Sequence, residues 1–162
     1  MSLRTAVRSL VLAGLLAPAG LRAQAVRHEL TLSAITVTFP TPTEANYDAG
    51  LVAASTSVTF TVDSRNGPTN VVRTSIVSIS ATGATMGGTK SVGDLQWRRT
   101  DLGIWTGLST TPVVVQQMPI QRNVLNDTWS NTVLFRTLLS WASDVPATYS
   151  ATIVFTLTIT TP

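Results

Sequence analysis

The chain has 162 residues, no cysteine, and a formal net charge of +3 from 11 basic and 8 acidic side chains. The absence of cysteine excludes disulfides, thiolate metal sites and a lipid anchor on cysteine. Arg4, Arg8 and Arg22 lie in the first 25 residues, so residues 26–162 carry no net charge. A neutral chain has no general electrostatic reason to bind nucleic acid or an anionic membrane, and we predict neither partner.

Residues 1–25 have the pattern of a secretory signal peptide. Basic residues precede a short apolar run over residues 10–17, and Ala23-Gln24-Ala25 provides the small residues of a cleavage site. The apolar run is too short to span a bilayer as a helix. We therefore expect cleavage between Ala23 and Ala25 and export to the periplasm, the cell surface or the medium. Export without cysteine is typical of a bacterial protein.

Residues 26–162 are expected to form a single domain, because their number suits one ordinary hydrophobic core. No apolar run in them approaches the length of a transmembrane helix. The first alternating segments are 30–32 and 35–39, which have opposite phase. The change at Ser33-Ala34 predicts a bulge or a strand that crosses between sheets. We favour residues 26–39 as the first strand of this domain over an arm that pairs with another subunit.

Further strands are expected along the rest of the chain, separated by turn signals at 48–50, 66–68 and 87–88. The last is the clearest, because apolar residues from Tyr149 to Ile159 alternate with Thr and Ser. No segment after residue 25 shows a helical repeat. About seven strands predict an all-β domain, a two-sheet antiparallel immunoglobulin-like β-sandwich. The expected strands after residue 39 are 58–62, 71–80, 95–98, 113–118, 133–141 and 148–162.

Two segments resemble parts of known bacterial surface sandwiches. Residues 144–152, with the sequence DVPATYSAT, are similar to the phrase that opens the final strand of many such modules. Residues 39–50 are similar to an early segment of the same modules. The chain thus resembles spore-coat-U-like, WxL-type and fimbrial-subunit-like domains, although Ala147 replaces the usual glycine and the cysteines of many of them are missing. The resemblance implies the fold and a place in adhesion or at the cell surface.

Candidate catalytic groups are few. His28 is the only histidine, and its place near the predicted new N-terminus leads us to expect an exposed side chain. One histidine and no cysteine cannot supply a zinc site, and they argue against a histidine-dependent nucleophile. Asp94 and Asp101 flank two tryptophans, as carboxylates of a glycosidase would, but their turn-like surroundings favour local hydrogen bonds.

Asparagine and aspartate in two other segments are conceivable calcium ligands, at Asn46 and Asp48 and at Asn126 and Asp127. Neither segment has the dense acidic spacing of a dedicated calcium loop. We therefore predict no metal, no cofactor and no enzymatic activity.

The four tryptophans are the strongest candidates for ligand contact or for core packing. Trp97 and Trp141 share the apolar phase of their segments and are predicted to be core residues. Trp105 and Trp129 stand in loop-like sequence, where tryptophan either caps a sandwich or provides an exposed anchor. Arg98 and Arg99 follow Trp97 at the end of a strand. The candidate contacts with a ligand or partner are Trp105, Trp129, Arg98 and Arg99.

These patterns predict an exported, non-catalytic structural subunit, cell-surface or fimbrial-like. It would act by pairing strand edges or packing against copies of itself or an envelope protein. The alternative is a carbohydrate-binding module that holds a glycan on Trp105 and Trp129.

Overall fold

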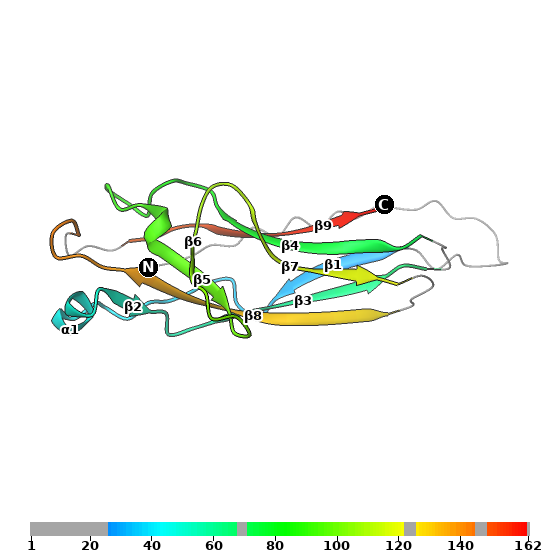
Figure 1. Cartoon of the computed structure of the whole chain (residues 1–162), viewed down its shortest axis with the longest axis horizontal. Helices are drawn as coiled ribbons and strands as arrows, with labels where there is room; N and C mark the ends of the chain where they lie inside the picture. The colour runs from blue at the N-terminus through cyan, green and yellow to red at the C-terminus, as the bar shows by residue number, and fades with distance from the viewer. Residues whose placement is uncertain (1–25, 68–70, 122–125, 145–148, 162) are drawn as a thin grey trace.

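The computed structural model describes residues 26–67, 71–121, 126–144 and 149–161, which form two antiparallel β-sheets packed face to face (Figure 1). The all-β expectation and the two antiparallel sheets are therefore confirmed. The predicted signal peptide, Pro68 of one predicted turn and residues 145–148 of the final-strand motif lie outside the described residues.

The larger sheet has six strands and the smaller has three. In the larger sheet the order is β1 (Arg27–Leu32), β3 (Val58–Arg65), β8 (Asp127–Leu138), β5 (Leu95–Arg99) and β6 (Thr106–Gly107), with β2 (Leu51–Ala53) also paired to β8. In the smaller sheet the order is β7 (Val113–Ile120), β4 (Arg73–Ala81) and β9 (Ile153–Thr160).

The core lies between the two sheets and follows the predicted alternation. On β3, Phe60 and Val62 are fully buried while Thr61 between them is half-buried. On β9, Ile153 and Phe155 are buried and the threonines of the opposite phase are exposed. Rings from the two sheets meet in the middle, because the centroids of Phe60 and Phe155 are 6.4 Å apart.

The predicted change of phase after β1 is confirmed, although residues 35–39 do not form a regular strand. Leu30 and Leu32 pack on the core from β1, whereas Val37 and Phe39 are the buried side chains of the next segment. The backbone of Thr38 holds this segment in place, since its carbonyl accepts the Ser55 amide at 2.9 Å.

One short helix, α1 (Glu44–Asp48), was not expected from the sequence. Thr43 begins it with a capping box, in which Thr43 Oγ1 accepts the Asn46 amide and the Asn46 side chain accepts the Thr43 amide. The helix lies at one end of the sandwich (Figure 1) and buries Tyr47. With five residues it is too short to produce a repeat in the sequence.

The prediction that Trp141 is a core residue is wrong. The β8 ladder ends at Leu138, the chain turns, and the strand phase therefore no longer applies at Trp141. The side chain is 60% exposed. Its ring stacks on Tyr47 at 4.5 Å and its Nε1 donates to Asp48 Oδ1, so it ties α1 to the end of β8.

The turn signals at Gly50, Gly67, Gly87 and Gly88 are confirmed by positive φ angles. Among the described residues, no helix combines the length and apolar character needed to cross a membrane.

Candidate binding surface

The clearest candidate for a contact surface is the outer edge of β9. This strand pairs with β4 on one side only, and no described residue hydrogen-bonds to the backbone on its other side. Its sequence, IVFTLTIT, contains neither a charge nor a proline. An edge strand of this kind presents a row of free amide and carbonyl groups to another chain.

The two other long end strands carry features that discourage such pairing. β1 begins with Arg27, His28 and Glu29. β7 contains Pro119, and its register with β4 shifts between Val77 and Ser78. Charges, proline and irregular register are common protections of a sheet edge. Among the long end strands, β9 is therefore the one best suited to strand addition.

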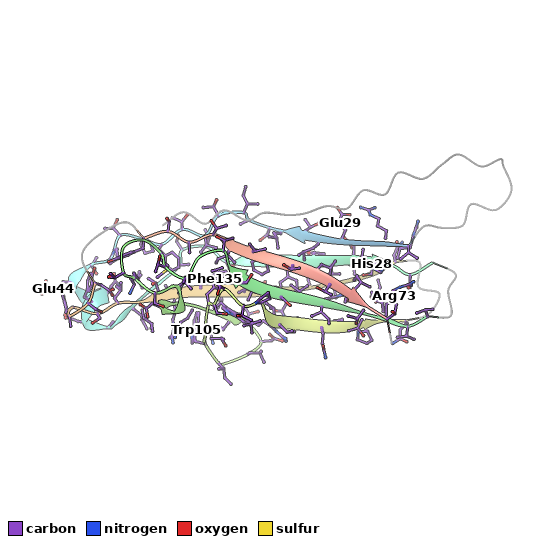
Figure 2. The ribbon with its side chains drawn as sticks, turned by 90° about the horizontal axis from the view of Figure 1, so that it is seen from above. His28, Glu29, Glu44, Arg73, Trp105 and Phe135 are labelled. Atoms are coloured by element: carbon purple, nitrogen blue, oxygen red, sulfur yellow. The ribbon has the colours of Figure 1, made fainter. Side chains whose placement is uncertain are left out.

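The predicted contact residue Trp105 lies in a loop, as expected, immediately before β6. Two guanidinium groups lie over its half-buried ring, with Arg98 Cζ at 4.9 Å and Arg136 Cζ at 4.4 Å from the ring centroid. Figure 2 shows Trp105 on the long side of the molecule opposite Glu29 of β1. Arg136 also donates to Gln96 at 2.7 Å. Nothing in the sequence pattern indicated Arg136, because it reaches Trp105 from β8.

Arg98 and Arg99 are adjacent in sequence but have different surroundings. Arg99 forms an ion pair with Asp101 and donates to the Val115 carbonyl at 3.1 Å, so its donors are used within the domain. The hydrogen bond from Arg99 lowers the pKa of Asp101, and the same pairing raises the pKa of Arg99. Arg98 has no carboxylate partner in the described part of the chain.

Two large apolar side chains of the Trp105 loop are exposed to solvent. Ile104 is 79% exposed, and Leu102 in the same loop is also exposed. An exposed isoleucine and leucine beside a cation–aromatic group are consistent with a surface that another molecule covers.

Trp129 is not in a loop, contrary to the sequence expectation, because β8 begins at Asp127. Its ring meets Phe60 edge-on at 5.5 Å, and its Nε1 donates to Ser75 Oγ of the smaller sheet at 3.1 Å. Trp129 therefore joins the two sheets, and its polar group is already used. Trp97 is buried, as predicted.

His28 is half-buried rather than exposed, because it lies on β1 opposite Ser64 of β3. Its Nδ1 is 3.2 Å from Ser64 Oγ, and its Nε2 is buried with no hydrogen-bond partner among the described residues. Burial, with a smaller contribution from the positive charge of Arg73, lowers the pKa of His28. The place of His28 near the predicted new N-terminus led to the wrong expectation, because the pairing of β1 with β3 extends to Arg27.

The carboxylates considered for catalysis or metal binding have separate partners. Asp94 pairs with Lys90 and Asp101 pairs with Arg99. Asn46 is used in the capping box of α1, and Asp48 accepts from Trp141. No group of three metal-ligating side chains occurs within the ranges that the structure describes.

The remaining pair, Asn126 and Asp127, lines a pocket of about 390 Å³ at the end of β3 and β8. Arg27 and Arg65 line the same pocket. Asp63 lines it as well, so the lining contains two basic and two acidic side chains.

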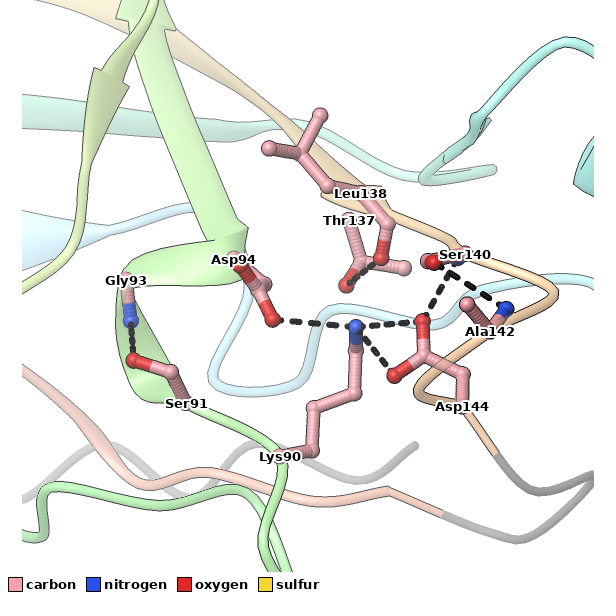
Figure 3. A network of polar contacts seen from close by, with 9 residues as sticks. All are labelled: Lys90, Ser91, Gly93, Asp94, Thr137, Leu138, Ser140, Ala142 and Asp144. Atoms are coloured by element: carbon pink, nitrogen blue, oxygen red, sulfur yellow. Dashed lines mark hydrogen bonds and ion pairs between the residues drawn. The ribbon is translucent and has the colours of Figure 1, made fainter.

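A second cluster, which the sequence reasoning missed, surrounds Lys90. The Lys90 side chain is 3% exposed and the Asp144 side chain is 5% exposed. Lys90 Nζ donates to Asp144 Oδ1 at 2.9 Å and Oδ2 at 2.8 Å, and to Asp94 Oδ2 at 3.1 Å (Figure 3). The signal that could have drawn attention to it is that Lys90 is the only lysine in the chain.

No protein-family model matches the chain, and no curated protein is similar to it in sequence.

Proposed function

We propose that this protein is an exported, non-catalytic structural subunit, cell-surface or fimbrial-like, that acts through contacts between its β9 edge and a strand of another chain. The partner is another copy or an envelope protein. Export rests on the leader pattern of residues 1–25, and the immunoglobulin-like type of sandwich rests on the resemblance of residues 144–152. The observation that carries the proposal is the uncharged, proline-free edge of β9.

Strand addition at β9 follows from the cost of leaving such an edge uncovered. Backbone amide and carbonyl groups on an open edge pair readily with any extended chain, and natural proteins suppress this with charges, prolines or bulges. β9 has none of the three, whereas β1 has charged residues and β7 has a proline and an irregular register. A strand that pairs with a partner chain is expected to lack these protections.

The glycan-binding alternative receives less support. A flat sugar platform needs exposed aromatic rings, but Trp129 packs on Phe60 and bonds to Ser75. Trp105 is half-buried and lies beside Arg98 and Arg136. This set favours an acidic or apolar protein surface over a neutral sugar, because guanidinium groups pair with carboxylates.

Lysine on β9 tests the proposal. Thr156 and Thr158 are exposed on β9, so Thr156→Lys and Thr158→Lys add charge without disturbing the core. The purified protein is expected to self-associate in sedimentation velocity or to sediment with envelopes, and each variant is expected to weaken this at least about tenfold through repulsion and desolvation.

The matched control is Thr61→Lys on β3, which is flanked by β1 and β8 and has no open edge. It should leave association unchanged. A wild-type protein that stays monomeric at high concentration and never sediments with envelopes contradicts the proposal. Equal weakening by all three variants contradicts the role of β9.

A further inference from the structure

Lys90 is a lysine where an arginine could form the same buried ion pair. The chain uses arginine for its other basic residues and lysine only here. Arginine holds a carboxylate with two parallel hydrogen bonds and is the usual choice for a buried pair. The property that lysine has and arginine lacks is an amine that becomes a nucleophile once it loses its proton.

We propose that Lys90 and Asp144 condense into an intramolecular amide, with Asp94 moving the proton. The new bond joins Lys90 Nζ to Asp144 Cγ. This inference goes beyond the proposed function, since it is a covalent modification of the domain itself and does not depend on any partner.

The step balances with the groups present. The Lys90 ammonium passes one proton to the Asp144 carboxylate, which gives a neutral amine and a neutral acid. The amine lone pair attacks Cγ, and Asp94 accepts a proton from the nitrogen and returns it to the departing hydroxyl. One water leaves, the ammonium and carboxylate become an amide, and Asp94 ends as the carboxylate it was. No oxidant, reductant or activating cofactor is required.

The geometry suits this reaction. Both Asp144 oxygens lie within 2.9 Å of Nζ, so the carbon between them is within roughly 3.5 Å of the nitrogen. A turn of the carboxyl group about its Cβ–Cγ bond would bring its face toward the amine for attack. Asp94 Oδ2 is 3.1 Å from the same nitrogen, within reach for proton transfer. Burial of the reacting pair lowers the cost of the neutral form relative to the charged form.

The backbone around the cluster helps to position Lys90 and Asp144. Lys90 follows a tight turn in which the Met86 amide donates to the Lys90 carbonyl at 2.9 Å, and Gly87 and Gly88 supply its positive φ angles. Asp144 closes its own turn, since Ser140 N donates to Asp144 Oδ2 at 2.8 Å. Little side-chain freedom remains to be lost during the reaction.

The surroundings also provide an exit for the water released. A pocket of about 290 Å³ lies beside the cluster and is lined by Lys90, Asp94 and Asp144 among others. Lys90 lies in the connection from β4 to β5, and Asp144 lies in the connection from β8 to β9, 54 residues later. The amide would join these two connections covalently, as a disulfide would in a chain with cysteine.

The resting pair is mainly charged, so the reaction is expected to be slow. Burial pushes the pKa of Lys90 down, but hydrogen bonds and charge from Asp144 and Asp94 push it further up, and the net pKa is raised. Only a small fraction of the pair is in the neutral form at any time. The measurement therefore follows the folded protein over days at neutral pH.

The intact mass of the denatured protein tests the proposal directly. The folded wild type is expected to become lighter by one water molecule. Trypsin should then fail to cut after Lys90 and should release a branched product in which residues 74–98 are joined to residues 137–162. An amine-reactive reagent should label only the α-amino group of the denatured chain, because Lys90 is the only lysine.

Three variants separate the roles. Lys90→Arg keeps the charge but cannot form the amide, so it should keep its full mass and melt about 10 °C or more below the condensed wild type. Asp144→Ala should also keep its full mass. Asp94→Asn should fold and condense at least about a hundredfold more slowly, as expected on removing a general acid–base group.

The proposal is overturned if the wild type keeps its full mass and Lys90 reacts with the amine reagent after denaturation. It is also overturned if a water is lost but no branched peptide joins the two segments, or if Lys90→Arg loses the same mass. These results leave the β9 proposal untouched, because sedimentation and mass are independent measurements.

Discussion

His28 is a single residue whose protonation is coupled to folding. In the folded chain its ring faces the hydroxyl of Ser64 and the positive charge of Arg73, and its Nε2 is enclosed without a partner among the described residues. Figure 2 shows His28 and Arg73 at the same end of the molecule, away from Glu44 of α1. A protonated ring would have to bury a second N–H donor without an acceptor, which is costly.

This coupling predicts a loss of stability in mild acid. The folded pKa of His28 is lowered from 6.5, so below pH 6.5 the unfolded chain takes up the proton first. Above pH 6.5, His28 adds no pH dependence to the free energy of unfolding. It decreases as the pH falls from there through the lowered pKa of the folded state. Urea denaturation measured between pH 7 and pH 5 should show this decrease.

The control for the pH effect is His28→Gln, which keeps a polar side chain opposite Ser64 but does not titrate. The variant should show a flatter dependence over the same pH interval, where ordinary carboxylates remain ionised. An equal slope in the variant and the wild type would contradict the assignment to His28.

At the scale of elements, β6 and the 3-10 helix η1 (Val92–Asp94) pack closely through two glycines. A methyl group on Gly107 would lie 2.8 Å from the Gly93 carbonyl oxygen, and a backbone atom cannot move aside as a side chain would. This contact positions Asp94 of η1 and, through β6, the loop that carries Trp105. The Lys90 cluster and the Trp105 loop therefore both depend on this contact between glycines.

Gly107→Ala is expected to lower the free energy of unfolding by about 1–3 kcal/mol, because the added methyl overpacks two backbones. Gly103→Ala is the matched control in the same connection, since nothing lies within 4 Å of its added methyl, and it should stay within about 0.5 kcal/mol of wild type. Chemical denaturation of the two variants compares them. A Gly107→Ala protein as stable as Gly103→Ala would show that η1 and β6 are not held at this distance.

The strands that could be predicted from sequence are the long ones with one buried face. The alternation from Ile153 to Ile159 and around Phe60 gives a period of two over several residues, which a helix does not produce. β2 and β6 have three and two residues, so they contain too little pattern to find. Trp129 was misassigned because polar residues surround it, although the ladder with β3 includes it.

The candidate sites were only partly predictable for a different reason. Trp105 and Arg98 are near in sequence and were found together, whereas Arg136 joins them from another strand. Lys90 and Asp144 are 54 residues apart, and no local pattern links them. The edge of β9 depends on sheet order, which alternation does not encode.

At the scale of the whole molecule, the sandwich holds together without cysteine by packing across the sheet interface. Phe60 is central to that interface. It is fully buried, meets Trp129 at 5.5 Å, and meets Phe155 of the opposite sheet at 6.4 Å. Domains of this size have total stabilities of about 5–15 kcal/mol, so a single core residue can contribute a large share.

Phe60→Ala should therefore lower the free energy of unfolding by about 3–5 kcal/mol, through lost burial and a cavity between the sheets. Thr61→Ala, one residue later on the outer face of the same strand, should cost less than about 1 kcal/mol. Urea denaturation followed by circular dichroism measures both. Both variants retain Lys90 and Asp144, so they carry the same state of that pair, and their difference reports packing alone. If the two substitutions cost the same, the sheets are not joined through Phe60, and the stability of the sandwich must come from its ends.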